Sequence, residues 1–316
     1  STGAMMNNVG KVKNTGVEIS LSTVNVQTKN FYWSTTFSFA KNKNEILELN
    51  GGKEDLIANK WFIGQPIDVI YDYEYAGVCT AEEAKAYATN DAIKTKFIEG
   101  EMKLKDQQQP GEEGYGIIDE NDLVVLGHAL PKWTGSVTSN MTYKNFDFSF
   151  SIYTKQGGMV ESPFMAEFTN YKDRGRNKLK MDYYIPAGTP VLNADGSGYT
   201  LTTEAHMGAY PYPTNTANNN YGGGIGWGTD KQTTYVGNSY VNNSFVKIKN
   251  ITLGYTFPKS WMSKIGVDHL RLYVNVLNPF TFTSYKGFDP EWAEAALNDG
   301  TGGPSSRTYQ VGVNLK

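Results

Sequence analysis

Apolar and polar residues alternate along much of the chain, which is the pattern of β-strands with one apolar and one polar face. The alternation is clearest where Phe146, Phe148 and Phe150 are separated by single polar residues. In the segment that starts at Phe245 the alternation changes register, which predicts a β-bulge near Asn250. Seven segments show the pattern, and strands are predicted over residues 16–26, 30–41, 132–143, 146–156, 245–257, 267–278 and 305–315.

The length of these segments and of their connections indicates a membrane barrel. Each segment has about 10–13 residues, whereas a typical globular strand has about 5–6, and a tilted strand crosses a bilayer in about 9–11. Short connections (27–30, 144–145 and 258–266) alternate with long ones (42–131, 157–244 and 279–304). Outer-membrane barrels have short periplasmic turns and long extracellular loops. We therefore expect an all-β fold: an antiparallel transmembrane β-barrel, with long extracellular loops and minor helix.

Aromatic residues support this interpretation, because they gather near the segment ends where interfacial girdles would lie: Trp33, Trp133, Tyr143, Phe146, Phe257 and Tyr285. A soluble β-sandwich that binds carbohydrate is the alternative, since the apolar strand faces would equally form a sandwich core. Seven strands are an odd number, whereas single-chain bacterial barrels have even numbers. Seven strands cannot close such a barrel by themselves, so residues 1–316 are expected to be a portion of one larger barrel domain.

Composition removes several functional classes. With 29 Lys and Arg against 32 Asp and Glu, the net charge is -3, and a basic nucleic-acid binder is excluded. The single cysteine, Cys79, excludes a disulfide scaffold and a CxxC site. The mean hydropathy of -0.46 does not argue against a barrel, because only alternate strand residues would face lipid.

Specific strings in the chain match a known family. They are NVGKVKNTGVE (8–18), FVKIKNITLGYTFP (245–258), RLYVNVLN (271–278), TSYKGFDPE (283–291) and YQVGVNL (309–315). Spread over nearly the whole chain and in order, they resemble the C-terminal part of the SusC/RagA-type TonB-linked outer-membrane proteins of Bacteroidota. Members of that family usually end in an aromatic residue, so one further residue is expected after Lys316.

The resemblance implies a function and partners. It implies a plugged barrel in the outer membrane that imports oligosaccharides (glycans), with a peptide importer of the same family as the alternative. Its partners would be outer-membrane lipid, a SusD-like surface lipoprotein lid, the remaining N-terminal barrel and plug, and the TonB complex acting through the plug. The C-terminus would lie on the periplasmic side. No enzymatic activity, catalytic residue or cofactor is expected.

Candidate site residues fall into two groups. In the long loops, aromatic rings that stack on sugar faces occur beside amides that pair with hydroxyls, and peptides would use the same groups. Packing among the loops or against a lid would also explain these residues: Tyr210, Tyr212, Asn218, Asn219, Tyr221, Trp227 and Trp292. The second group comprises polar strand residues expected to face the lumen: Glu18, Asp147, Lys247, Lys249, Arg271 and Asn275.

A metal site is not expected. Residues 106–122 occupy the place of a calcium-loop-like stretch in the family, but with Gly116 as the loop glycine two ligand positions fall on Gly111 and Tyr115. A structured loop is therefore favoured over a calcium site. The three histidines show no ligand spacing. A capping box at Thr80 and Glu83 predicts a short helix over 81–88.

Overall fold

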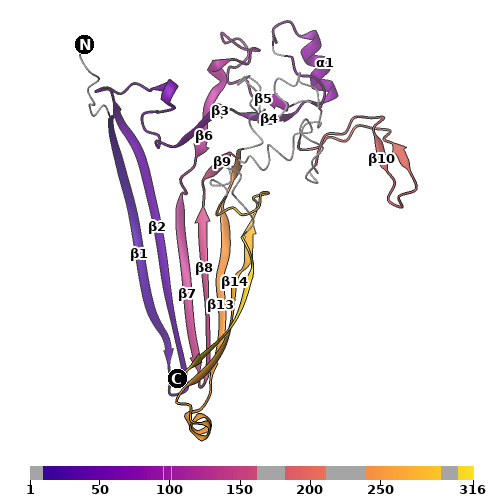
Figure 1. Cartoon of the computed structure of the whole chain (residues 1–316). Helices are drawn as coiled ribbons and strands as arrows, with labels where there is room; N and C mark the ends of the chain where they lie inside the picture. The colour runs from indigo at the N-terminus through magenta and orange to yellow at the C-terminus, as the bar shows by residue number, and fades with distance from the viewer. Residues whose placement is uncertain (1–9, 95, 101, 162–181, 211–239, 293–304) are drawn as a thin grey trace, which may run out of the picture.

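A computed structural model describes residues 10–94, 96–100, 102–161, 182–210, 240–292 and 305–316. Seven long strands form one sheet, in which every neighbouring pair is antiparallel and the spatial order follows the chain (Figure 1). They are β1 (Gly10–Gln27), β2 (Phe31–Leu49), β7 (Trp133–Tyr143), β8 (Phe146–Gln156), β13 (Phe245–Thr256), β14 (Leu270–Thr283) and β15 (Thr308–Leu315). The expected all-β fold is confirmed, and β1 and β15 form the two outer edges of the sheet.

Three strands differ most from the predicted bounds, and β15 also begins three residues late, at Thr308. β1 and β2 stay paired from Gly10 and Leu49 downward, beyond the predicted 16–26 and 30–41, because their backbones continue to hydrogen-bond where the alternation of apolar and polar residues has stopped. β14 begins at Leu270 and not at 267, since the short connection from β13 holds a helical turn, α3 (Lys259–Met262), followed by η4 (Ser263–Ile265). It continues past Asn278, whose positive φ of 49° marks an irregularity that ends the simple alternation.

The predicted bulge in β13 is confirmed. The register shifts between Ile248 and Asn250 in the pairing of β13 with both β8 and β14. Opposite β8, Lys249 is therefore an extra residue, while opposite β14 the single Lys249 faces two residues, Asn278 and Pro279. Because of this bulge, Lys249 and Asn250 together separate Ile248 from Ile251, and both isoleucines lie on the apolar face.

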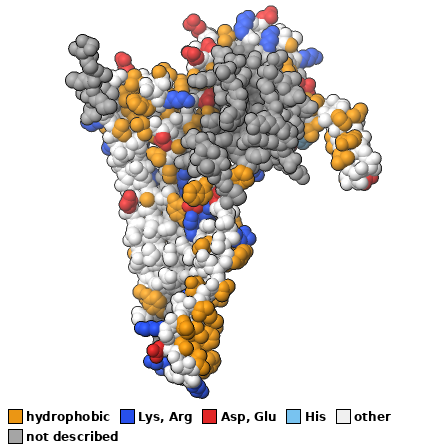
Figure 2. Space-filling model, viewed as in Figure 1, with side chains coloured by type: hydrophobic (Ala, Val, Ile, Leu, Met, Phe, Trp, Pro, Cys, Tyr) orange, Lys and Arg blue, Asp and Glu red, His pale blue; other side chains and the backbone are white. Residues whose placement is uncertain are grey.

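The sheet has one apolar and one polar face. On β15 the apolar side chains of Tyr309, Val311 and Val313 are 70%, 80% and 59% exposed, so nothing in the described parts of the chain covers them. Figure 2 shows hydrophobic side chains gathered at the lower right of the sheet. The opposite face carries serine, threonine, asparagine and charged residues. A soluble sandwich would bury such an apolar face under a second sheet, so the arrangement supports the barrel interpretation.

The long connections all leave the same end of the sheet, called here the loop end, and fold into small elements (Figure 1). The predicted capped helix is present as α1 (Ala81–Thr89), with Thr80 and Glu83 in a capping box. The small strands were not predicted and pair as β3 (Val69–Tyr73) with β6 (Leu123–His128), β4 (Tyr75–Val78) with β5 (Met102–Leu104), β9 (Met159–Glu161) with β12 (Tyr240–Asn242), and β10 (Pro190–Leu192) with β11 (Tyr199–Leu201). Two single turns, η1 (Ile57–Asn59) and η2 (Glu120–Asp122), complete them.

Buried apolar residues lie among these loop elements. One cluster joins Cys79, Phe97 and Leu104, and a second joins Val160 and Tyr285. The opposite end of the sheet, the turn end, holds the short connections and the C-terminus (Figure 1). No helix within the described ranges is long and apolar enough to cross a membrane.

Candidate functional site

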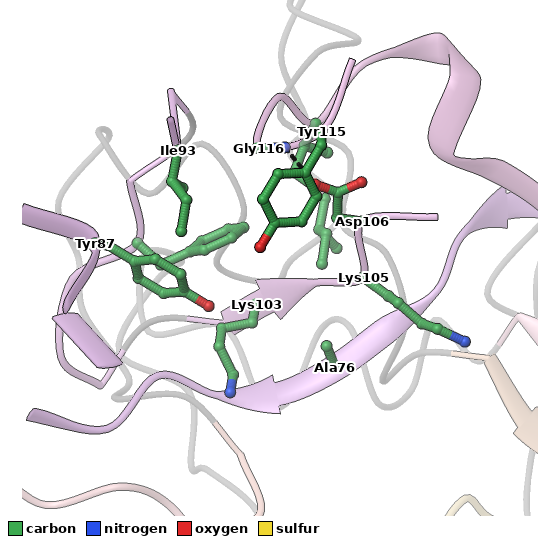
Figure 3. Close-up of a pocket in the computed structure, with 11 residues that line it drawn as sticks. Ala76, Tyr87, Ile93, Lys103, Lys105, Asp106, Tyr115 and Gly116 are labelled. Carbon is green, nitrogen blue, oxygen red and sulfur yellow. Dashed lines mark hydrogen bonds between the residues drawn. The ribbon is translucent and has the colours of Figure 1, made fainter. Parts of the chain in front are cut away.

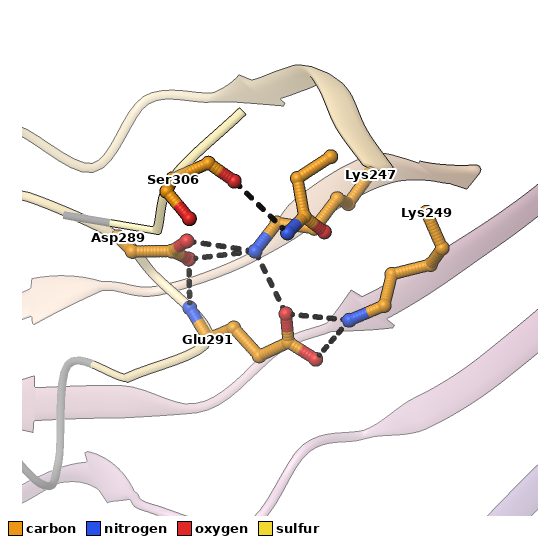
Figure 4. A network of polar contacts seen from close by, with 6 residues as sticks. Lys247, Lys249, Asp289, Glu291 and Ser306 are labelled. Carbon is orange, nitrogen blue, oxygen red and sulfur yellow. Dashed lines mark hydrogen bonds and ion pairs between the residues drawn. The ribbon is translucent and has the colours of Figure 1, made fainter. Parts of the chain in front are cut away.

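A buried network of charged side chains lies on the polar face of the sheet, near the loop end. Lys247 on β13 has a side chain only 1% exposed. Its Nζ donates hydrogen bonds to both carboxylate oxygens of Asp289, at 3.0 and 2.7 Å, and to Glu291 at 2.7 Å. Lys249 donates to both oxygens of Glu291, at 2.8 and 2.9 Å (Figure 4). Two lysines and two carboxylates thus form one network.

This network fixes the segment that follows β14, residues 284–292, which we call the anchored segment. Asp289 and Glu291 both belong to it, and the Glu291 N–H donates to the Asp289 carboxylate at 2.9 Å. At its start, Tyr285 is 7% exposed and packs with Val160 and Val241 of the β9–β12 pair. The segment is therefore held to the sheet by ion pairs at one end and by apolar packing at the other.

The network keeps both carboxylates charged. Burial by itself raises the pKa of Asp289, but hydrogen bonds from Lys247, Ser305 and the Glu291 backbone outweigh it, so the pKa lies below its ordinary value. Burial likewise raises the pKa of Glu291, and hydrogen bonds from Lys247 and Lys249 lower it further than burial raises it. At neutral pH both carboxylates of the cluster are therefore negatively charged.

A second ion pair lies on the polar face near the turn end. Arg271 on β14 binds Asp147 on β8 in bidentate fashion, Nε to Oδ1 at 2.9 Å and Nη2 to Oδ2 at 2.6 Å. Its guanidinium also lies 4.8 Å from the ring centroid of Tyr273. Gly254 on the intervening strand leaves the space for this pair, because a Cβ there would meet the Asp147 carboxylate and lie 2.6 Å from Arg271 Nη2.

We expect Gly254→Ala to displace this ion pair and lower the free energy of unfolding by about 1–3 kcal/mol, the usual cost of overpacking. Denaturant titration of the full protein in detergent would measure the change. In an Asp147→Ser background the added methyl no longer meets a carboxylate, so most of the penalty should disappear. An equal penalty in both backgrounds would contradict this explanation.

The other polar-face candidates are placed as follows. Asn275 joins a row of side chains across three strands, accepting from Thr252 and donating to Gln310, both at 2.9 Å. Glu18 lies on the outer strand β1 opposite Ala40 and is exposed. The structure thus brings Lys247 together with Lys249, and Arg271 with Asp147, while Glu18 and Asn275 lie apart from both groups.

Two of the loop candidates can be placed. Tyr210 is partly buried, its backbone pairs with Asp182 and Tyr184, and its ring contacts Tyr183. Trp292 ends the anchored segment with a side chain 55% exposed. The two lie on different loops. The remaining candidates lie outside the described residues: Tyr212, Asn218, Asn219, Tyr221 and Trp227.

Two cavities open among the loop elements. One, of about 240 Å³, is lined by Tyr87, Phe97, Lys103 and Tyr115 between α1 and the β4–β5 pair (Figure 3). The other, of about 370 Å³, is lined by Glu74, Tyr75 and Tyr240 among others. Cavities that hold drug-sized ligands have volumes of about 300–1,000 Å³, so the second cavity lies at the lower end of this range and the first lies below it. They bring together distant stretches of the chain, so the local sequence pattern gives no sign of them.

The loop at 106–122 is organised by its own backbone. Asp106 accepts hydrogen bonds from the N–H groups of Gln108 at 2.9 Å and Gly116 at 2.6 Å. Asp122 accepts from Gln107 at 2.7 Å and Asp119 at 2.8 Å. All four carboxylate oxygens therefore have backbone donors, as in a structured loop. Across the described part of the chain, no three His, Cys, Asp or Glu residues are arranged to hold a metal ion.

Sequence reasoning named the two lysines of the network but not their counter-ions. Asp289 and Glu291 lie in the string TSYKGFDPE (283–291), where no alternation of apolar and polar residues marks a face. Charge could have identified these counter-ions. Lys247 and Lys249 lie on one strand face next to a long loop, and buried lysines require anionic partners. An Asp-Pro-Glu sequence lies in that loop.

Comparison with known proteins agrees with this architecture, although no protein-family model matches the chain. TonB-dependent receptor P3 of Formosa agariphila is 28% identical over 342 residues, covering 99% of this chain and 29% of the receptor. TonB-dependent receptor SusC of Bacteroides thetaiotaomicron is 27% identical over 320 residues, covering 99% and 27%. The solved structure of the RagAB peptide transporter superposes with a TM-score of 0.61 at 22% identity, covering 98% of this chain and 30% of that chain.

These similarities confirm the resemblance to SusC/RagA-type proteins and the barrel fold class. The chain spans less than a third of the length of each of these relatives. They are named as receptors and transporters and not as enzymes, in agreement with the expectation that the chain is not an enzyme.

Proposed function

We propose that the chain is the C-terminal part of a TonB-dependent importer in the outer membrane, and that it takes up oligosaccharides together with a surface lipoprotein lid. The observation that carries the proposal is a seven-stranded sheet with one apolar face and all long connections at one end, similar over 99% of its length to TonB-dependent receptors. In this proposal the apolar face meets lipid and the polar face lines the lumen. The loop end is extracellular and the C-terminus periplasmic.

The mechanism is binding and gated passage. Substrate would be held between the loops and the lid, and a pull by TonB on the plug would open a path along the polar face. Lys247, Lys249, Arg271 and Asp147 lie on that face, where their charges are paired with each other and with the anchored segment. The wall therefore presents few free charges to a neutral oligosaccharide.

Glycan uptake is favoured by the aromatic and amide-rich loops. A peptide substrate is the second candidate, because the RagAB structures that share this fold are those of a peptide importer. A peptide would contact the same Tyr and Trp rings and amides through its backbone, and growth on defined substrates distinguishes the two.

Deleting the gene of the full protein is expected to abolish growth on one class of oligosaccharide while growth on the component monosaccharide is unchanged. The readout is growth on defined carbon sources, together with fractionation of the protein. We expect it in the outer-membrane fraction, soluble only in detergent, and co-purifying with one lipoprotein. Lost growth on oligopeptides with glycan growth intact would assign the peptide substrate. Recovery from the soluble fraction would contradict the proposal.

A further inference from the structure

A lysine cluster, made of Lys13, Lys41 and Lys43, lies at the loop end of β1 and β2, and all three side chains are exposed. Residues that pair across an antiparallel sheet share a face, and so do residues two apart along one strand. The apolar row of these two strands includes Phe39, which pairs with Ile19. By this spacing the three lysines continue the same row beyond its apolar part, so the cluster lies on the apolar face of the sheet and not on the polar one.

The cluster begins one bilayer crossing away from the turn end. β2 pairs with β7 only over residues 31–40, and a tilted strand crosses a bilayer in about 9–11 residues. Lys41 is the first residue beyond this stretch, where β1 and β2 continue without β7 (Figure 1). Just before it, the ring centroids of Phe39 and Trp133 lie 5.8 Å apart on the apolar face. Because aromatic rings gather at the interfaces of membrane barrels, the lysines lie at the level of the lipid headgroups.

The cluster carries an excess of positive charge. Glu45 pairs with Lys13, and its carboxylate accepts a hydrogen bond from Lys43 at 2.9 Å, so three lysines share one carboxylate. Neither Lys13 nor Lys41 forms an ion pair with another residue in the described part of the chain. Thr15, opposite Lys43, adds a hydroxyl donor on the same face. Neighbouring positions on one face lie roughly 5–8 Å apart, so these long side chains can converge on a single anion.

The strands that carry the cluster are held in place from their opposite face. Asn44 donates to Asn14 at 2.8 Å and accepts from the N–H of Ile67 at 3.0 Å. Ile46 is 1% exposed, and its N–H donates to the carbonyl of Gln65 at 2.9 Å. The first long loop thus packs against the polar-face side of β2 and leaves the lysines exposed on the other side. The cluster is therefore a positive patch on a fixed backbone.

We propose that the lysine cluster binds the phosphate of an anionic membrane lipid in the leaflet at the loop end, and that the hydrocarbon chains of this lipid lie against Phe39 and the apolar row below it. A phosphorylated lipid carries its negative charge directly above hydrocarbon, which matches a lysine patch directly above an apolar row. A soluble anion would match only the lysines. This inference rests on the proposed function, in which the apolar face meets lipid and the loop end is extracellular.

The test measures the preference of the full, detergent-purified protein for phosphatidylglycerol over neutral phosphatidylcholine, by native mass spectrometry of the bound lipid. Lys41→Gln combined with Lys43→Gln should lower this preference about 10–30-fold, since each lysine near a headgroup favours anionic lipid about fivefold. Replacing the same two lysines by arginine should preserve it, and Glu45→Gln should raise it. The matched control is Lys53→Gln with Lys85→Gln, which removes two exposed lysines from the first long loop and should leave the preference within about twofold.

The outcomes separate this inference from the function on which it rests. If the Lys41/Lys43 glutamine variant keeps its preference, or the Lys53/Lys85 control loses as much, the cluster is not a lipid site and the function stands. Displacement of the lipid by inorganic phosphate would show a site for free anions and overturn the inference. So would loss of a co-purifying protein while the lipid preference is retained, because the patch would then be a protein contact. Recovery of the unaltered protein from the soluble fraction would contradict the function and this inference together.

Discussion

Replacing Lys247 by methionine is expected to release the anchored segment from the sheet. The lysine side chain is 1% exposed and that of Asp289 is 2% exposed, so the substitution leaves a buried carboxylate without its cation. Removing one partner of a buried pair typically costs about 3–5 kcal/mol. We expect local opening of residues 284–292 to become about a hundred- to several-thousand-fold more frequent. Hydrogen exchange of the Glu291 and Trp292 amides in the full protein would measure it.

Lys249→Met is the matched control. The Lys249 side chain is 37% exposed, and in this variant Glu291 still accepts a hydrogen bond from Lys247. The free energy of opening the anchored segment should therefore fall by less than about 1 kcal/mol. Adding Asp289→Asn to Lys247→Met removes both buried charges and should recover most of the lost protection. Equal effects of the two lysine substitutions would show that the buried pair does not hold the segment.

The dependence on pH supplies a second check of the same prediction. The pKa values of Asp289 and Glu291 are lowered in the folded protein, so their stabilisation is fully present above the ordinary carboxyl pKa of about 4. It is lost as the pH falls through the lowered values. In Lys247→Met the sign should reverse at Asp289, because burial without a cation raises its pKa and protonation then favours the closed segment.

The sequence predicted the sheet best where one strand face is apolar. β8, with its alternating phenylalanines, starts and ends where it was predicted, because an amphipathic strand repeats every two residues. Residues 10–15 of β1 and 42–49 of β2 were missed because apolar and polar residues do not alternate there, although Ile46 and Leu49 are buried. Most short strands of the loop elements pair across long stretches of sequence, as Val69 does with His128, so no local pattern marks them; β10 and β11 differ, because a short turn joins them.

The sequence predicted which polar residues lie on the lumen-facing strand face, but not which of them form ion pairs. Alternation placed Asp147 and Arg271 on one face, yet it did not show that they pair. Their contact depends on β13 lying between β8 and β14 with a glycine at position 254. Alternation also identified Lys247 and Lys249. Asp289 and Glu291 were missed because loop residues follow no repeating pattern of apolar and polar positions.

Leu253→Arg is expected to destabilise the barrel, because Leu253 lies on the apolar face of β13 toward its turn end and its side chain is 46% exposed. In the proposed orientation this side chain meets the hydrocarbon layer between its centre and the periplasmic interface, where an arginine costs up to about 2–4 kcal/mol. The matched control is Thr252→Arg, one residue earlier on the polar face and within reach of Asn275 and water in the lumen. Thr252→Arg should lower the free energy of unfolding by less than about 1 kcal/mol, and neither the strand nor the added charge differs between the variants.

Reversible unfolding of the full protein from lipid vesicles measures the free energy of unfolding of both variants. If Thr252→Arg is the more damaging, the polar face meets lipid and the proposed orientation of the sheet is wrong; if both cost little, the apolar face lies against something other than a hydrocarbon core.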